Sequence, residues 1–316
     1  MIFLSFYFFF FVLLNIIIIL KINYLASIFN LYDSSQNKLH NNDTPKFGFF
    51  IFLLIYLSSL ILYFDKIDYN ILFINIYFFI FLMIGYFDDI FNLNVLIRIL
   101  FAGFVTLTFY ALNPFDFYVS LSFSSYTNLF LLCFFTLGFI HLVNITDGLN
   151  GLVPTIFLYS CFYYLFKGYG YFDSYTLNLL VLTIISFLII LIPNFYGKFF
   201  LGNSGSYSVA ILSSFFYMKL YKQGILEYSD ILLIYFIPLI DGLRVTSIRI
   251  FNKKNPFKGD YLHIHHLIRD KKNFIFGYYV LILFPSFINY FNKDFSILIA
   301  ILSFLLYLLM LRFLDK

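Results

Sequence analysis

The chain has 316 residues, of which 62% are hydrophobic and 11% are charged, with a formal net charge of +4. An average soluble domain carries about 25% charged residues, so this composition excludes an ordinary water-soluble protein. Long apolar runs recur from Ile2 to Leu314, and no polar segment between them is large enough to fold alone. The sequence therefore predicts a single membrane-embedded domain over residues 1–316.

The apolar runs match the length of membrane-spanning helices, which need about 20 mostly apolar residues. We expect an all-α, polytopic integral membrane protein. The predicted spans are eleven in number and cover residues 2–20, 47–64, 71–87, 95–112, 126–143, 150–166, 175–192, 205–221, 229–248, 275–291 and 295–313.

The basic residues orient these spans. Eleven spans put the two termini on opposite sides, and fifteen of the 20 Lys and Arg residues fall on the side of the C-terminus. Because cytoplasmic loops carry an excess of Lys and Arg, this side is predicted to be cytoplasmic and the N-terminus to lie outside. All five histidines and four aspartates are predicted to lie on or beside this cytoplasmic face. A random distribution would place some of them on the other face.

An acidic pair, Asp88-Asp89, stands at the cytoplasmic end of the third predicted span. Adjacent carboxylates repel each other, so at a membrane boundary they indicate a cation ligand or a proton acceptor. The alternative is a polar helix end in headgroup water.

The segment from Asn144 to Gly151 joins the fifth and sixth predicted spans and contains Asp147 and Asn150. These side chains supply hard oxygen ligands, and the glycines allow the backbone to turn tightly or to approach a ligand. An ordinary Asx-Gly turn would have the same residues.

The sequence Gly202-Asn203-Ser204-Gly205-Ser206 opens the eighth predicted span. Backbone N–H groups at such a helix start can bind phosphate. A capped helix start without a ligand is equally consistent with these residues.

The last large cytoplasmic loop begins near Asp241 and Arg249 and ends in His263-Ile-His265-His266. Arg, Lys and protonatable His at this density favour a phosphorylated ligand. Two alternatives are topogenic charge in contact with anionic lipid, and a histidine metal site. The first does not explain the histidines, and the second lacks a cysteine partner because both cysteines lie in apolar runs.

Taken in order, these motifs resemble the polyprenyl-phosphate N-acetylhexosamine-1-phosphate transferases of glycosyltransferase family 4, in particular the undecaprenyl-phosphate GlcNAc-1-phosphate branch. The resemblance covers nearly the whole chain. It rests on Asp33 with Lys38, His40 and Pro45, on Asp88-Asp89, on Asn144, Asp147 and Gly148, on Gly202 with Gly205-Ser206, and on His263, His265 and His266. Departures from the family pattern are found at Asn37, Phe47 and Asn150, and most importantly at Asn203, which replaces a metal-binding aspartate.

The resemblance implies transfer of a sugar-1-phosphate from a UDP-sugar to a polyprenyl phosphate at the cytoplasmic face of the inner (plasma) membrane. The implied partners are the lipid acceptor, the UDP-sugar and the membrane, with no nucleic acid, and a homodimer is compatible with the resemblance. Mg²⁺, or Mn²⁺ in its place, is the implied cofactor. The implied metal ligands are Asp88, Asp147 and Asn203, the implied catalytic residues are Asp88, Asp89 and His265, and the implied substrate-binding residues are Lys38, His40, Asn144, Asp147, Arg249, His263 and His266.

Two other functions remain open from the sequence. A non-catalytic relative that binds the nucleotide or lipid is supported by Asn203, because a neutral amide binds Mg²⁺ more weakly than a carboxylate. A transporter of a lipid-linked or anionic solute would place charges near the bilayer midplane and often show repeat symmetry. The ionisable residues instead gather at the ends of the predicted spans.

Overall fold

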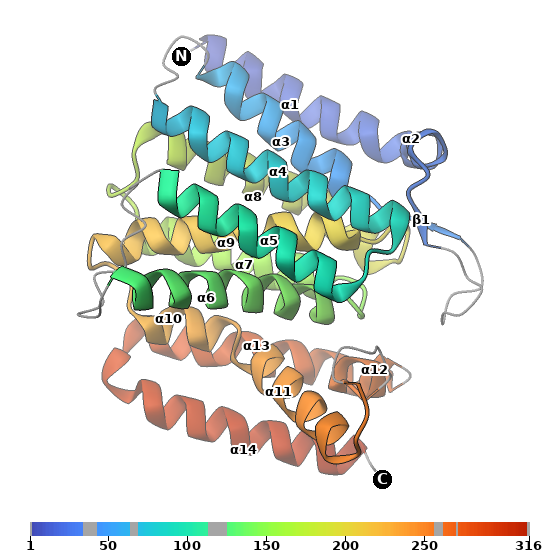
Figure 1. Cartoon of the computed structure of the whole chain (residues 1–316), viewed down its shortest axis with the longest axis vertical. Coiled ribbons are helices and arrows are strands. Elements are labelled where there is room, and N and C mark those ends of the chain that lie inside the picture. Colours follow the sequence, from blue (N-terminus) through green and yellow to red (C-terminus); the bar gives the residue numbers. More distant parts are fainter. Residues whose placement is uncertain are drawn as a thin grey trace. The chain divides into compact units, whose positions relative to one another are not determined.

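The computed structural model describes residues 2–33, 43–63, 69–112, 125–255, 262–269 and 271–314. Within these ranges the chain is almost entirely helical, with one two-stranded antiparallel pair, so the all-α prediction is confirmed. The predicted site residues Lys38 and His40 lie outside the described residues. The helices group into two compact units, Met1–Gln223 and Gly224–Lys316, which are treated separately below (Figure 1).

The first unit contains nine helices and the strand pair within its described residues. Its elements are α1 (Ile2–Leu20), α2 (Ile22–Phe29), β1 (Tyr32–Asp33), β2 (Thr44–Pro45), α3 (Gly48–Leu62), α4 (Tyr69–Phe91), α5 (Val95–Leu112), α6 (Ser125–Thr146), α7 (Leu152–Lys167), α8 (Ser174–Phe195) and α9 (Gly202–Lys222).

The second unit is built from α10 (Tyr228–Ile234), α11 (Phe236–Phe251), α12 (Ile264–Arg269), α13 (Lys272–Phe291), the short 3₁₀ helix η3 (Lys293–Phe295) and α14 (Ser296–Leu314). In this unit α13 packs against α10, α11, α12 and α14.

Helix α9 forms the centre of the first unit, where it packs against α3, α4, α6 and α7. Its first turns carry glycine and serine in place of large side chains, and Ser204, Gly205 and Ser206 are buried. Small residues let helix backbones approach closely. On α4, the close approach also requires glycine at position 85, because a Cβ atom there would overlap the backbone of Ser204. This packing brings the end of α4 against the start of α9.

All eleven predicted apolar runs fall on helices. In the described part of the chain, four helical segments are long and apolar enough to cross a membrane, or up to six if each of two bent helix pairs forms one span. The four segments are Ile71–Phe91, Ser174–Phe195, Asn273–Phe291 and Lys293–Leu314, and the bent pairs are Phe6–Leu20 with Ile22–Phe29 and Tyr228–Ile234 with Phe236–Phe251. The total of eleven spans and their orientation stay predictions.

One predicted span is not a straight helix. The run 229–248 is divided into α10 and α11, whose axes differ by 68°. Pro238 explains the position of the break, because a proline ring clashes with the carbonyl four residues earlier and removes a helical hydrogen bond. That carbonyl belongs to Ile234, where α10 ends. The predicted run 229–248 is therefore a bent helix pair, and whether it forms one span stays a prediction.

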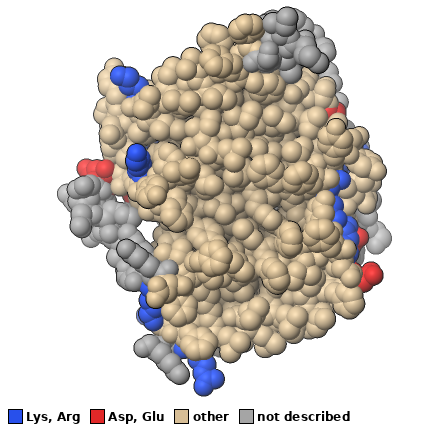
Figure 2. Space-filling view, turned by 180° about the vertical axis from the view of Figure 1, so that it is seen from behind, with Lys and Arg blue, Asp and Glu red and all other residues tan. Residues whose placement is uncertain are grey.

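The outer surfaces of the helices are apolar. Phe101 and Phe104 on α5, and Phe287 and Phe291 on α13, are exposed. Figure 2 shows a surface on which charged side chains are few and uncharged residues cover most of the visible area. Exposed apolar surface of this extent fits contact with lipid rather than water.

Candidate active site

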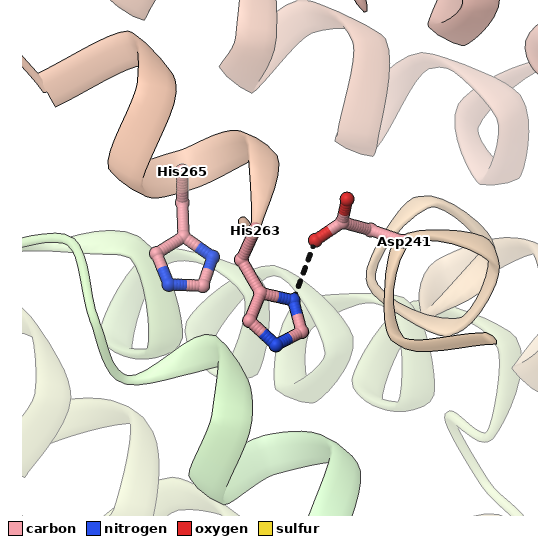
Figure 3. A group of neighbouring side chains, drawn as sticks. All are labelled: Asp241, His263 and His265. Atoms are coloured by element: carbon pink, nitrogen blue, oxygen red, sulfur yellow. Dashed lines mark hydrogen bonds and ion pairs between the residues drawn. The ribbon is translucent and has the colours of Figure 1, made fainter. Parts of the chain in front are cut away.

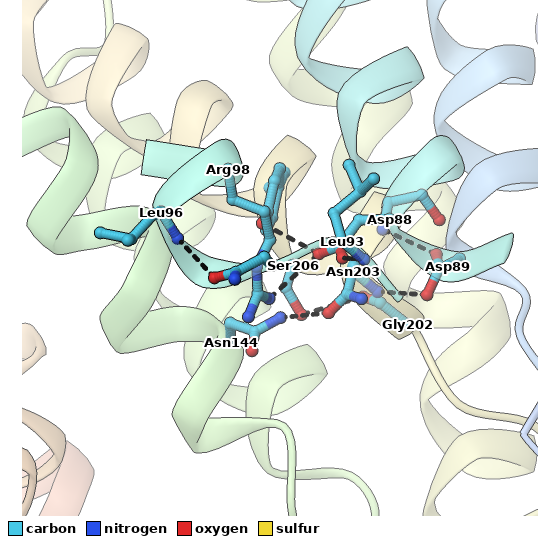
Figure 4. Close-up of polar contacts among 12 residues, drawn as sticks. Asp88, Asp89, Leu93, Leu96, Arg98, Asn144, Gly202, Asn203 and Ser206 are labelled. Atoms are coloured by element: carbon cyan, nitrogen blue, oxygen red, sulfur yellow. Dashed lines mark hydrogen bonds and ion pairs between the residues drawn. The ribbon is translucent and has the colours of Figure 1, made fainter. Parts of the chain in front are cut away.

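Asp89 lies at the end of α4 and caps the start of α9 (Figure 4). Its Oδ1 accepts a hydrogen bond from the backbone N–H of Asn203, and its Oδ2 accepts one from Ser204, both at 2.9 Å. Gly202 makes this turn with a φ of 70°, a value that glycine adopts without strain. Asp89 thus accepts from two of the N–H groups at this helix start, and phosphate binding there stays a prediction.

Lys46 supplies the counter-charge of Asp89. Its Nζ lies 3.2 Å from Asp89 Oδ1 and donates to the Asp89 carbonyl at 3.1 Å. The backbone of this segment is fixed beside the start of α9, because Phe47 N donates to Phe200 O and Phe200 N donates to Pro45 O. The sequence predicted only that Lys46 is a basic residue of a cytoplasmic loop. Its partner Asp89 is 43 residues away, and the local sequence does not indicate that the two are paired.

Asp88 faces a different set of donors. Its Oδ1 accepts from the backbone N–H of Leu93 at 3.0 Å, and its Oδ2 accepts from Arg98 Nη1 and Tyr207 Oη, each at 3.1 Å. Arg98 and Tyr207 were not predicted as site residues. Only three residues connect α4 and α5, so the first turn of α5, which carries Arg98, must lie near the end of α4. This short connection is the feature of the sequence that could have indicated Arg98.

Asn144 and Asn203 are joined across the site, with Asn144 Nδ2 donating to Asn203 Oδ1. Figure 4 shows the two amides pointing toward each other. The backbone of Gly202 and the hydroxyl of Ser206 lower the pKa of the Asp147 carboxyl, but not enough to offset its burial. Loss of hydration raises the pKa of Asp147 well above its usual range, and the negative charge of Asp89 adds to the rise.

The first unit thus gathers five predicted site residues from three separate segments: Asp88, Asp89, Asn144, Asp147 and Asn203. Negative charge accumulates around Asp147, because Asp33 as well as Asp89 disfavours its ionised form. A cation near Asp147 would relieve this repulsion.

The second unit contains a separate polar group (Figure 3). Asp241 of α11 and the histidines His263 and His265 are buried, and one donor atom of each lies within 4.8 Å of the others. His263 Nδ1 lies 2.9 Å from Asp241 Oδ2. Asp241 also pairs with Arg244 at 2.9 Å. Asp241 had been assigned no role from the sequence.

The three histidine rings gather together. Ring centroids are 5.4 Å apart for His263 and His265, and 4.2 Å apart for His265 and His266. Burial lowers the pKa of His265 well below its usual range, and the neighbouring rings of His266 and His263 add to the effect. Arg249, near the end of α11, is also buried. The prediction that these residues share one pocket with the group in the first unit stays a prediction.

The family model described as glycosyl transferase family 4 matches residues 71–221. This stretch is similar to glycosyl transferase family 4, and residues 71–221 are called the family 4 segment below. The predicted resemblance to this family is thereby confirmed. The family 4 segment runs from α4 to α9 and includes the five predicted residues gathered in the first unit, whereas His263, His265 and His266 lie beyond it.

A curated relative is similar over a longer stretch. It is undecaprenyl-phosphate alpha-N-acetylglucosaminyl 1-phosphate transferase of Thermotoga maritima, 30% identical over 190 residues. The match covers 60% of this chain and 58% of the relative, so the chain spans less than two thirds of that protein's length.

Some of the polar residues in the family 4 segment are suited to bind a hard cation, and others are already engaged by protein donors. Asp147 and the amide oxygen of Asn203 supply oxygen donors of the kind that Mg²⁺ prefers. The oxygens of Asp88 already accept from three protein donors, and those of Asp89 accept two backbone N–H groups and contact Lys46. An ion at Asp88 would meet Oδ1, which accepts only the Leu93 N–H, more readily than Oδ2, which is held by Arg98 and Tyr207.

Proposed function

We propose that the chain transfers an N-acetylhexosamine-1-phosphate from a UDP-sugar to undecaprenyl or another polyprenyl phosphate, releasing UMP and starting a lipid-linked cell-surface glycan. One observation carries the proposal: the acidic and amide residues from the ends of α4 and α6 and the start of α9 form a single hydrogen-bonded group within the family 4 segment. The named relative catalyses a reaction of this kind, according to its name.

The chemistry requires two phosphate groups to meet. An oxygen of the lipid phosphate forms a bond to the phosphorus that carries the sugar, and the bond between that phosphorus and the UMP oxygen breaks. Both reactants are negatively charged, so the main task of the protein is to position them and neutralise charge. The acceptor's tail stays in lipid while its phosphate reaches the cytoplasmic face, where the soluble nucleotide arrives.

The proposed roles follow the predicted residues. Asp88 lies beside the acceptor phosphate, where Arg98 neutralises charge once it is released from the carboxylate, and Asp89 holds the start of α9 in place. Asn144 and Asp147 bind on the nucleotide and metal side. Mg²⁺, or Mn²⁺ in its place, would be held by Asp147 and Asn203, with Asp88 as a further ligand, and would supply charge neutralisation to the phosphates.

The remaining roles lie in the second unit and in the first inner loop. His263, His265 and His266 with Arg249 are proposed to bind the diphosphate, because imidazole N–H and guanidinium groups donate hydrogen bonds to phosphate oxygens. Lys38 and His40 are proposed to contact the substrate from the loop outside the described residues. The active site is proposed to face the cytoplasm at the inner (plasma) membrane.

The direct test is a transfer assay. The purified protein in detergent is incubated with Mg²⁺, undecaprenyl phosphate and a panel of UDP-N-acetylhexosamines, and UMP and the lipid product are measured. We expect UMP release that requires both the lipid phosphate and the ion. Absence of UMP with every sugar, from protein that remains folded, would contradict the proposal.

A non-catalytic binding protein is the second candidate, because Asn203 holds its amide oxygen against Asn144 and adds no charge for a cation. The variant Asn203→Asp separates the two functions. If the natural chain binds UDP-sugar without turnover and the variant transfers the sugar phosphate, the binding function is correct. If the natural chain transfers, the enzyme proposal stands.

A further inference from the structure

Asp241 accepts hydrogen bonds on both of its carboxylate oxygens. Oδ1 accepts from Tyr307 Oη at 2.7 Å and from Arg244 Nη2 at 2.9 Å, and Oδ2 lies 2.9 Å from His263 Nδ1. The backbone N–H of Ile264 lies 3.3 and 3.2 Å from the two oxygens. Asp241 is 3% exposed, so these groups replace its hydration.

The direction of these bonds can be assigned from the donors. Arg244 Nε, which always carries its proton, donates to Tyr307 Oη at 2.7 Å. The tyrosine oxygen therefore accepts from Arg244, and its own proton points to Asp241 Oδ1. With a guanidinium, a hydroxyl and a backbone N–H directed at it, Asp241 is an ionised acceptor. The proton between Asp241 and His263 must then lie on His263 Nδ1.

We infer that Asp241 is a positioning residue that fixes His263 in the Nδ1–H form, so that Nε2 is the ring nitrogen available to a phosphate oxygen of the substrate. Figure 3 shows this geometry: Nδ1 faces Asp241, and the other nitrogen of the ring points away from it. The inference rests on the proposed function for its substrate. When phosphate binds, Nε2 takes up a proton from water and donates it in a hydrogen bond to a phosphate oxygen, while the Asp241 carboxylate compensates the imidazolium charge.

A metal ion is the other ligand that Asp241, His263 and His265 could hold. Two observations disfavour it. Both oxygens of Asp241 are engaged by donors, and the Arg244 guanidinium, 2.9 Å from Oδ1, would repel a cation. Ligands of a tetrahedral ion are also separated by about 3.4 Å at ordinary zinc bond lengths, so the 2.9 Å contact would have to open. The arrangement suits a proton better than an ion.

The sharpest variant is Asp241→Asn. The amide oxygen must stay toward Tyr307 and Arg244, since both are donors, and the amide NH₂ then faces His263 Nδ1. Because an NH₂ group needs an acceptor there, the neutral ring must lose its proton from Nδ1 and carry it on Nε2. The matched control is Tyr307→Phe, which removes a donor to Oδ1 and leaves the contact between Oδ2 and His263 intact.

The primary measurement is ¹⁵N NMR of histidine-labelled full-length protein in nanodiscs, with the His263 signals assigned by their loss in His263→Gln. We expect the Nδ1–H form in the natural chain and in Tyr307→Phe, and the Nε2–H form in Asp241→Asn. Neutral His263 with its proton on Nε2 in the natural chain would overturn the inference, whether or not Asp241→Asn folds. So would loss of the Nδ1 proton on addition of one equivalent of Zn²⁺.

Turnover provides the link to function. We expect Asp241→Asn to lower kcat by about 10- to 100-fold, the range found for the outer partners of metal-bound histidines, because its neutral amide does not compensate an imidazolium charge. Tyr307→Phe should stay close to the natural chain. Equal losses in both variants would show that Asp241 acts only through stability and would overturn the positioning role. The tautomer measurement does not require transfer, so a failure of the proposed function would remain distinguishable from a failure of this inference.

Discussion

The ion pair between Asp89 and Lys46 gives the most decisive test of the site geometry. In Asp89→Asn, the amide presents an NH₂ group to one of the two backbone N–H donors at the start of α9, and Lys46 loses its counter-charge. Both side chains are buried, with Asp89 at 0% and Lys46 at 11% side-chain exposure. Breaking such a pair on one side destabilises a protein by about 3–5 kcal/mol.

A double-mutant cycle separates the pair from the rest of the site. We expect Lys46→Met to destabilise by less than Asp89→Asn, since Asp89 keeps its two backbone donors, and the double variant to show a coupling energy of about 1–3 kcal/mol. The matched control is Lys219→Met. It breaks a Lys–Asp contact of 3.3 Å whose side chains are 39% and 51% exposed, so its effect should be at most about 1 kcal/mol.

The assay is reversible unfolding in mixed detergent micelles, followed by circular dichroism. If Asp89→Asn were within about 0.5 kcal/mol of the natural chain, or the coupling energy were zero, then Asp89 would not cap α9 as described. Loss of transfer activity in Asp89→Asn without loss of stability would instead favour a purely catalytic role.

Three further predictions concern packing, charge and the second unit. Gly85→Ala should destabilise by about 1–3 kcal/mol in the same assay, because its Cβ meets the α9 backbone, whereas Gly103→Ala, with the nearest atom 3.7 Å away, should be neutral or stabilising. The folded-state pKa of Asp147 is raised above its unfolded value of about 3.9, so its ionisation destabilises the fold as pH rises from that value through the folded pKa. Asp147→Asn should therefore raise the free energy of unfolding at pH 7 without Mg²⁺. The same variant should abolish the stabilisation of about 2.7 kcal/mol that Mg²⁺ gives the natural chain at 100 times its dissociation constant. An unchanged Mg²⁺ effect would place the ion elsewhere. Lys293 contacts two carboxylates, the buried Asp230 at 3.3 Å and Glu227, whose side chain is 61% exposed. Asp230→Asn should destabilise by about 3 kcal/mol and Glu227→Gln by less than about 1 kcal/mol. Similar losses of stability in thermal unfolding of the two variants would contradict this difference in burial.

The class of the protein could be predicted from the sequence because lipid leaves the backbone few choices. An apolar run in a membrane must satisfy its own hydrogen bonds, so a series of such runs predicts helices, and all eleven runs fall on helices. The break at Tyr235 was less visible, although Pro238 stood in the sequence, because Pro193 and Pro285 are accommodated inside continuous helices. Whether a proline ends a helix depends on what else satisfies the freed carbonyl.

The sequence by itself determined which residues carry charge at the ends of the apolar runs, and their order predicted the resemblance to glycosyltransferase family 4. Only the tertiary structure decided how these residues are paired. Asp89 binds backbone groups 114 and 115 residues away, and Asp241 binds Tyr307 across 66 residues. The physical reason is that a buried carboxylate takes whichever donors helix packing brings within about 3 Å, and local sequence does not contain that distance.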